Sequence, residues 1–483
     1  MPRPSLTLAA DGDVLRGAFA AVRRELEVPE ELPAEVLAEA SAAATSSADP
    51  YADERADLLD VPFVTIDPPG STDLDQAVHL ERRPGGYRVR YAIADVAAFV
   101  RPGGATDGEA HRRGETVYCP DGRVPLHPEV LSEGAASLLP GVERLAVVWG
   151  FDLDADGAVT STDVRRGRVR SREQLDYAGV QAQLAGAGRD DLPTLLAEIG
   201  TLRAQQERAR GGVSLGRPEQ EVVPVGDGWR LEYRAPLPVE DHNAQVSLLT
   251  GMAAAGLMLE VGVGVLRTMP PADAESLARL RRQARALGVG WADGEEYGDV
   301  LARLDRTEPA TAAFLSAATA LFRGAAWTPF EGTPPAQVLH GAIAAPYAHV
   351  TAPLRRLVDR YGLEVSLAAH AGRPVPAWVT DALPALGEEM AHAARRSSAV
   401  DRACTDVVEA AVLAPHVGAL FDGVALDHDT VQLTDPAVVA RCDGEDLPVG
   451  ERVRVRLARA DVDAREVRFS LDEPGTSAAQ ARG

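Results

Sequence analysis

Three aspartates in the segment Asp67-Pro-Pro-Gly-Ser-Thr-Asp73-Leu-Asp75 have a spacing that could serve metal chemistry. The apolar run at residues 63–66 predicts a strand that ends at Asp67, and the Pro-Pro-Gly that follows breaks it. Asp73 and Asp75 are two residues apart, so in an extended chain they point to the same side. Converging carboxylates suit hard cations, and a pair of such ions can cleave a phosphodiester. On spacing alone, a solvated turn capped by aspartates explains the cluster equally well.

A second acidic run, Asp152-Leu-Asp-Ala-Asp-Gly157 with Asp163 at the twelfth position, partly matches a calcium-binding EF-hand loop. That motif needs a helix on each side, whereas residues 147–153 and 158–164 alternate as strands do. Asp-Gly between two strands is a strong hairpin signal. We therefore predict a β-hairpin here and no calcium site.

The elements that must position the first cluster belong to a mixed α/β domain predicted for residues 59–412. A helical segment, residues 1–58, precedes it, with helices expected at residues 13–28 and 34–43. Within the domain, the hydrophobic pattern predicts strands at 63–66, 87–93, 147–153 and 158–164, and helices over 175–210 and 240–412 apart from an irregular stretch at 327–353.

The C-terminal part has a different texture. Four short apolar-polar alternations are separated by turn residues, at 421–426, 430–433, 452–457 and 466–471. Closely spaced short strands predict a small OB-like β-barrel over residues 413–473. Barrels of this type often bind single-stranded nucleic acid. Residues 474–483 are expected to form a disordered tail.

Composition narrows the classes of function. The 483 residues carry a net charge of −23, so any surface that binds a nucleic acid would have to be a local basic cleft. The chain contains no lysine. This excludes enzymes that depend on a P-loop lysine, a Schiff-base lysine or a kinase strand lysine. Arginine remains, and its planar fork suits phosphate.

Cellular location is also suggested by composition. Cys119, Cys404 and Cys442 are far apart in the sequence, which argues against a disulfide scaffold or a zinc site and fits a reducing cytoplasm. The N-terminus lacks the apolar stretch of a signal peptide. Residues 248–266 approach the length of a membrane span but contain Glu260, so a buried helix followed by a turn is expected and no membrane contact.

The segment around the aspartates, residues 63–77, resembles the signature of the ribonuclease II / ribonuclease R (RNB) family. Further stretches resemble that family's motifs in the same order. They are Ala92-Ile-Ala-Asp-Val96, Arg113-Gly-Glu-Thr-Val-Tyr118, Val124-Pro-Leu-His-Pro128 and Tyr347-Ala-His-Val-Thr-Ala-Pro-Leu-Arg-Arg356. Together they run from about residue 60 to residue 405. An ordered set of this length is far more specific than any single motif.

The resemblance implies an α/β catalytic domain with a channel for single-stranded RNA that leads to a two-metal site. Mg²⁺, with Mn²⁺ as an alternative, would be held by Asp67, Asp73 and Asp75, with the chemistry depending most on Asp75. Arg355 would stabilise the charge on the scissile phosphate. The further RNA contacts implied are Tyr118, Tyr177, Arg356 and Asp401.

The sequence also departs from the family pattern. Gln76 stands where the family has a fourth aspartate, so it could ligate metal only through its amide oxygen. Such a site carries less negative charge, and we expect a preference for Mn²⁺ over Mg²⁺ at low metal concentration. Val222 stands where the family often has an aromatic residue as the second jaw of a base clamp.

Three hypotheses follow. The first is a processive, monomeric, cytoplasmic 3′→5′ exoribonuclease that releases nucleoside 5′-monophosphates from single-stranded RNA. The second is an RNA-binding protein on an RNB scaffold whose catalysis is weakened by Gln76. The third is a metal phosphoesterase for small substrates, against which the barrel and the long match argue.

Overall fold

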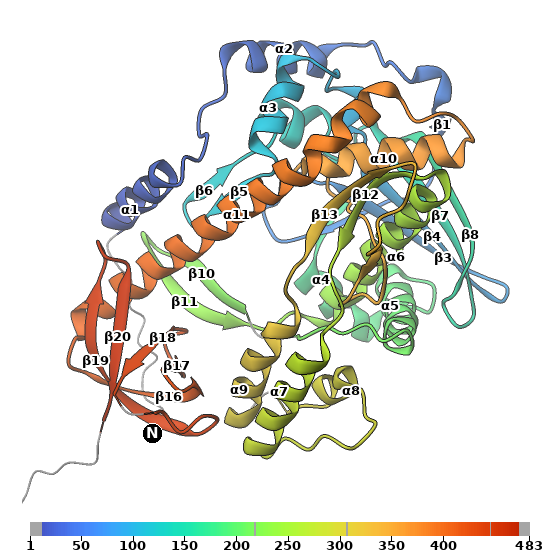
Figure 1. Ribbon diagram of the computed structural model, residues 1–483. Helices are drawn as coiled ribbons and strands as arrows, with labels where there is room; N and C mark the ends of the chain where they lie inside the picture. Colours follow the sequence, from blue (N-terminus) through green and yellow to red (C-terminus); the bar gives the residue numbers. More distant parts are fainter. Residues whose placement is uncertain (1–11, 217–218, 306–307, 445, 473–483) are drawn as a thin grey trace, which may run out of the picture.

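The computed structural model describes residues 12–216, 219–305, 308–444 and 446–472. Figure 1 shows a large α/β part and a small β-barrel, with the long helix α11 (Ala377–Leu413) running from one to the other. The predicted mixed α/β fold with a C-terminal barrel is therefore confirmed. The predicted disordered tail at 474–483 lies outside the described residues, and the domain boundaries stay a prediction.

A five-stranded sheet with the order β1-β8-β7-β4-β3 forms the centre of the large part. Tyr91 lies opposite Trp149 in the antiparallel register, and both side chains are buried, as the alternating pattern predicts. The predicted β7–β8 hairpin is confirmed. Asp154 Oδ1 accepts from the amides of Asp156 and Ala158 at 3.0 and 2.8 Å, so this aspartate closes the turn. The strands are β1 (Ala56–Asp57), β3 (Gln76–Arg83), β4 (Gly86–Ala94), β7 (Arg144–Asp154) and β8 (Val159–Val169).

A short strand beside this sheet carries the first aspartate. β2 (Thr65–Asp67) pairs in parallel with β9 (Gln174–Asp176), so Asp67 lies opposite Asp176. Val64 forms an isolated bridge with Val78 of β3, which ties β2 to the large sheet. Helix α4 (Tyr177–Gln183) begins directly after β9, and Asp176 caps it by accepting from the Gly179 amide at 2.7 Å.

Helices cover the sheet. The described chain has one helix long and apolar enough to cross a membrane, α6 (Pro238–Val261). It packs against α5 (Leu192–Ala209) and α10 (Leu357–His370), with Val246, Leu249 and Met258 fully buried. The predicted buried helix followed by a turn is confirmed, because Gly262 ends α6 at φ 73°.

Two predictions for the central region were wrong. Residues 263–268 lie in the stretch expected to be mostly helical but form the strand β12 (Val263–Thr268). The stretch expected to be irregular, 327–353, begins with most of the strand β13 (Ala326–Glu331), which pairs with β12 as a two-stranded ribbon. The left-handed turn at Gly262 sends the chain out of the helix into this ribbon. The smaller elements of the large part are α3 (Ala105–Arg113), β5 (Val117–Cys119), β6 (Gly122–Val124), β10 (Glu219–Val225), β11 (Gly228–Arg234), α7 (Ala274–Ala286), α8 (Tyr297–Ala302), α9 (Pro309–Ala318), β14 (Leu339–His340) and β15 (Ala345–Pro346), with a π-helical turn at Val130–Ala135.

The barrel closes in the order β16-β17-β18-β20-β19. Four of its strands match the predicted ones, and β18 was not predicted. Its core is continuous with the end of α11 and with the N-terminal helix α1 (Gly12–Glu25), through residues such as Phe19, Val408 and Phe469. The remaining elements are α2 (Ala34–Thr45), β16 (Leu420–Asp427), β17 (Thr430–Leu433), β18 (Val439–Asp443), β19 (Arg452–Asp461) and β20 (Glu466–Leu471).

Candidate active site

Asp75 is the most deeply buried of the three aspartates, with 3% of its surface exposed. Its Oδ1 accepts from the amide of Leu354 at 2.8 Å, and its Oδ2 accepts from Arg355 Nε at 3.3 Å. Burial raises the pKa of Asp75 to about 7, although Arg355 and the Leu354 amide oppose this. The fold thus brings together two motifs about 280 residues apart in the sequence.

Asp67 lies beside it at the end of β2. Its Oδ2 is buried and has no hydrogen-bond partner among the described residues. The pKa of Asp67 is raised to about 6, chiefly by burial; Arg355 opposes this shift and the charge of Asp73 adds to it. Tyr177 comes directly after β9, the strand that pairs with β2, and its hydroxyl lies 3.5 Å from Asn243 Nδ2. The negative charge of Asp67 raises the pKa of Tyr177, after burial, so this predicted RNA-binding tyrosine lies near the acidic cluster.

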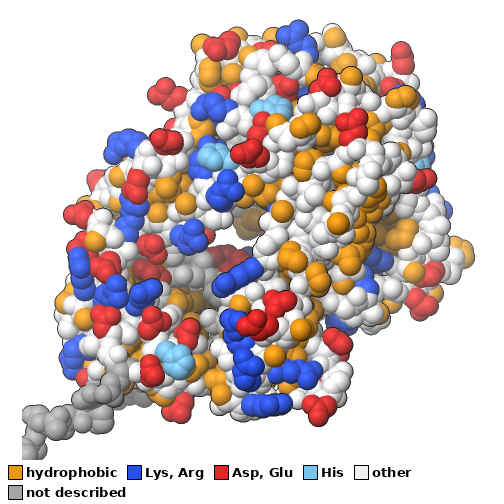
Figure 2. All heavy atoms as spheres, in the orientation of Figure 1, with side chains coloured by type: hydrophobic (Ala, Val, Ile, Leu, Met, Phe, Trp, Pro, Cys, Tyr) orange, Lys and Arg blue, Asp and Glu red, His pale blue; other side chains and the backbone are white. Residues whose placement is uncertain are grey.

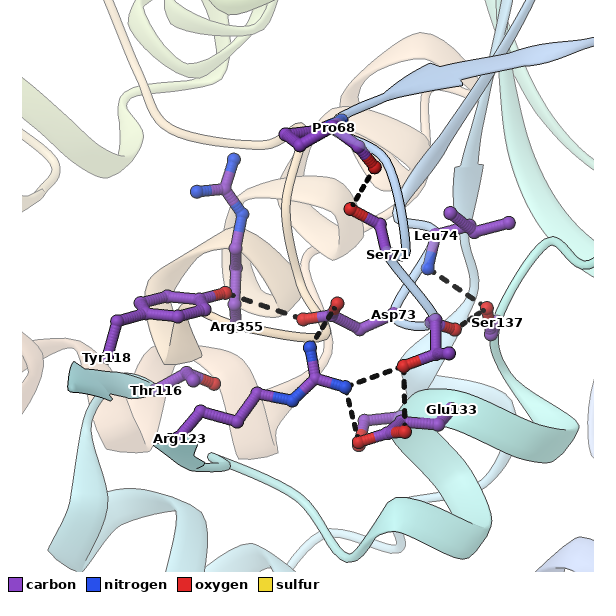
Figure 3. Close-up of polar contacts among 12 residues, drawn as sticks. Pro68, Ser71, Asp73, Leu74, Thr116, Tyr118, Arg123, Glu133, Ser137 and Arg355 are labelled. Carbon is purple, nitrogen blue, oxygen red and sulfur yellow. Dashed lines mark hydrogen bonds and ion pairs between the residues drawn. The ribbon is translucent and has the colours of Figure 1, made fainter. Parts of the chain in front are cut away.

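Asp73 has different surroundings. Arg123 Nη1 donates to its Oδ1 at 2.7 Å, and the Tyr118 hydroxyl donates to its Oδ2 at 3.4 Å (Figure 3). Tyr118 and Arg123 are directly opposite each other in the β5–β6 hairpin. Arg123 was missed by the reasoning from sequence. The Pro120-Asp121-Gly122 stretch could have revealed it, because proline at the second and glycine at the fourth position of a turn predict a tight hairpin, here with Cys119 opposite Gly122 and Tyr118 opposite Arg123.

Gln76 is held at both ends of its amide. Its Nε2 donates to the carbonyl of Thr351 at 2.6 Å, and its Oε1 accepts from the Tyr91 hydroxyl at 2.7 Å. A backbone carbonyl can only accept, which fixes the orientation of the amide. The Ser247 hydroxyl, 2.8 Å from Tyr91, therefore donates to Tyr91. Metal ligation by Gln76 stays a prediction, and the observed task of this side chain is to hold the Thr351 segment.

The two neighbouring arginines differ. The side chain of Arg355 is 43% exposed, and beyond its Nε contact with Asp75 its guanidinium has no further partner among the described residues. Arg356 instead forms two hydrogen bonds with the fully buried Asp359, at 3.0 and 2.8 Å. Arg355 is thus free to meet a phosphate, whereas Arg356 is engaged in holding its own segment.

A cavity of about 960 Å³ lies next to this cluster, and Figure 2 shows the face hollowed beside α11. Tyr118 and the predicted RNA contact Asp401 both line it, and so does Val222. The expected basic lining is absent, because Arg402 is the sole cation among the described lining residues. The acidic ones are Glu219, Glu221, Asp241, Asp401, Asp406 and Glu409. The arginines near the aspartates are instead paired with acids of the site itself.

The chemistry of the aspartates fits a divalent cation. Two carboxylates are desolvated, and one of their oxygens, Asp67 Oδ2, has no partner among the described residues. A buried carboxylate of this kind is stabilised in its charged form by a bound cation. The described residues contain no group of three or more acids, histidines or cysteines close enough to hold one ion. Asp67 and Asp75 would hold a cation, and Asp73 would join them with the oxygen that faces Tyr118.

Comparison with known proteins identifies the class. The RNB domain matches residues 55–363, and the RNase II-type exonuclease C-terminal S1 domain matches residues 419–472. The chain therefore belongs to the RNB family and carries a C-terminal S1 domain, which confirms the resemblance seen in the sequence.

Individual relatives are more distant. Ribonuclease R of Escherichia coli (strain K12) is 27% identical over 475 residues, covering 86% of this chain and 57% of that protein. The chain thus spans about half the length of the curated relatives it matches. Mycoplasma genitalium RNase R in complex with ribose-methylated single-stranded RNA has a TM-score of 0.84 at 19% identity, over 95% of this chain and 78% of that one.

A further structural neighbour shows the range of the fold. Yeast Ssd1, described as a pseudonuclease, has a TM-score of 0.68 at 16% identity, over 91% of this chain and 57% of that one. Both structural likenesses concern the fold alone. The scaffold is thus shared by nucleases and by a pseudonuclease, so activity must be argued from the side chains.

Proposed function

We propose that this protein is a metal-dependent 3′→5′ exoribonuclease that hydrolyses single-stranded RNA processively to nucleoside 5′-monophosphates. The observation that carries the proposal is the contact between buried Asp75 and Arg355 Nε, which leaves the other two guanidinium nitrogens of Arg355 without a partner among the described residues. A buried carboxylate next to an exposed arginine is the arrangement that cation-assisted cleavage of a phosphodiester needs. Family membership and the S1 domain support the same activity.

The residues of the site would have separate roles. Arg355 would bind the scissile phosphate and stabilise the negative charge that develops on it. The half-exposed ring of Tyr118 would stack on a base near the 3′ end. Divalent cations held by the aspartates would activate the attacking water and stabilise the leaving oxygen. We expect this activity from a monomer in the cytoplasm.

The alternative is an RNA-binding protein with weakened catalysis, and Gln76 favours it because a carboxylate is missing. A 5′-labelled single-stranded oligoribonucleotide separates the two. Incubated with Mg²⁺ or Mn²⁺, it should shorten from its 3′ end and release 5′-monophosphates, and EDTA should stop the reaction. A retarded but intact RNA with either metal, for the wild type as for Asp75→Asn, would establish the alternative.

A further inference from the structure

Arg123 belongs to none of the roles assigned so far. It lies opposite Tyr118 in the β5–β6 hairpin, and the two side chains contact the two oxygens of Asp73 (Figure 3). One carboxylate thus joins the hairpin to the loop of aspartates. The loop itself has no regular structure at Asp73, so the backbone alone does not fix this side chain.

The guanidinium of Arg123 is itself held from the other side. Its Nη2 donates to Thr72 Oγ1 at 2.6 Å and pairs with Glu133 Oε1 at 2.5 Å. Thr72 in turn donates to Glu133 Oε2 at 2.7 Å. A planar guanidinium with partners on two nitrogens has little rotational freedom, so it presents Nη1 to Asp73 in one direction.

We propose that Arg123 is a positioning residue that orients Asp73 and couples base stacking on Tyr118 to cation binding. This rests on the proposed function. Arg123 occupies Oδ1 and leaves Oδ2 beside the Tyr118 hydroxyl, and the charge of Asp73 also acts on Asp67. A base that settles on Tyr118 then stabilises the orientation of Asp73 that a cation needs. Because binding energies are linked, a bound cation strengthens RNA binding by the same factor by which bound RNA strengthens cation binding.

The test compares wild type with Arg123→Met. The probe is a short oligoadenylate with non-hydrolysable 3′-methylene phosphonate linkages at its 3′ end, and its Kd is measured in Mn²⁺ and in EDTA. We expect Mn²⁺ to tighten wild-type binding by about 5- to 100-fold, in the usual range of coupling. In Arg123→Met the ratio of the Kd in EDTA to the Kd in Mn²⁺ should fall close to one, while the Kd in EDTA stays at the wild-type value. Affinity that falls equally in both conditions would make Arg123 a direct RNA contact and overturn the proposal.

Kinetics on cleavable RNA give a second readout. Misplacing Asp73 should lower kcat by about 100-fold and leave KM within about threefold, because positioning acts on the reacting geometry. Arg123→Lys keeps the charge but can reach one partner at a time, so its coupling should lie between those of wild type and Arg123→Met. Full coupling in the lysine variant would show that charge alone suffices and would refute the positioning role.

A matched control is Arg168→Met. Arg168, on β8, also bridges two carboxylates, Asp57 of the edge strand β1 at 2.9 Å and Glu143 at 3.3 Å. Its loss should change neither the coupling nor kcat. A wild-type protein that shows no metal-dependent cleavage overturns the proposed function itself. An active wild type together with unchanged coupling in Arg123→Met overturns only the role of Arg123.

Discussion

The buried region around Asp75 and Asp359, called the aspartate pocket below, and the C-terminal barrel differ in how their charged side chains are paired. In the pocket, Asp75 and Asp359 are almost fully buried, and each is bound by an arginine and by a backbone amide. On the barrel, Arg454 and Arg456 are about half exposed and lie beside acids on the surface. Removing one partner from a buried pair is costly, whereas an exposed pair contributes little. Substitutions in the pocket should therefore change rate or stability, and those on the barrel should change RNA affinity.

The largest effect is expected for Asp75→Asn. The asparagine can still accept from the Leu354 amide, so the pocket keeps its shape, but it loses the charge that would hold a cation. We expect cleavage to fall by at least about 1000-fold with RNA affinity nearly unchanged. Rates come from single-turnover assays and affinity from anisotropy in EDTA. Activity within about tenfold of wild type would remove Asp75 from the mechanism.

Arg355→Ala should come next, with kcat lower by about 100- to 1000-fold and a much smaller loss of binding, because its contribution grows as charge develops. Its neighbour sharpens the contrast. Arg356→Ala removes both charged hydrogen bonds from the fully buried Asp359, so it should lower Tm more than Arg355→Ala, which removes a single longer contact with Asp75 at 3.3 Å. Equal losses of kcat and affinity in Arg355→Ala would make it a binding residue only.

The pH should matter in the pocket. Burial raises the pKa of Asp67 to about 6 and that of Asp75 to about 7, against about 4 in an unfolded chain. Because the folded state holds these protons more tightly, the metal-free protein should lose stability as pH rises from about 4 to 7. A cation binds the ionised form, so the increase in Tm produced by Mn²⁺ should grow over the same interval. An increase that is constant from about pH 5 to pH 8 would contradict this.

Gln76→Asp tests two opposed expectations. If residue 76 is a metal ligand, the added charge should raise activity at low Mg²⁺ and reduce any preference for Mn²⁺. The hydrogen bonds predict the reverse, because a carboxylate cannot donate to the Thr351 carbonyl. We expect the rate to fall about tenfold at every metal concentration, the size of one lost buried hydrogen bond. Metal titrations on the same short RNA decide, and a higher rate at low Mg²⁺ would return Gln76 to the metal site.

Local pattern predicted much of this molecule. Strands β4, β7 and β8 follow from alternation, and the hairpin at Asp154 follows from its turn residues. The ribbon of β12 and β13 could not be predicted in this way, since its strands are about 60 residues apart in sequence and lie between helices. Pairing of this kind is a tertiary effect that short-range propensity does not report.

In the site, too, some residues could be predicted from the sequence and others could not. The three aspartates and Arg355 were found because each belongs to a motif with family spacing. Arg123 was missed, because its role depends on lying opposite Tyr118 and on reaching Glu133, which is ten residues away on another element. The engagement of Arg356 with Asp359 was likewise hidden, since sequence alone does not tell a free arginine from a paired one.

RNA binding by the barrel is better tested with surface substitutions than with a truncation. Its core is shared with α1 and with the end of α11, so deleting it would expose buried side chains such as Phe19 and Val408. β19 offers a cleaner change. Its arginines Arg452, Arg454 and Arg456 point outward and alternate with buried apolar residues. Replacing all three by glutamine should preserve the core and remove three candidate phosphate contacts.

The smallest effect is expected from this triple variant. Single-stranded RNA should bind about three- to tenfold more weakly, and the slope of log affinity against log salt should decrease by about 2 if all three arginines meet phosphates. Cleavage of oligomers too short to reach the barrel should be unchanged. A control replaces Arg165 and Arg168 of β8 and Arg172, just beyond that strand, by glutamine and so removes the same charge from the large α/β part. If both triple variants weaken long-RNA binding equally, overall charge is responsible and the outer face of β19 is not an RNA-binding surface.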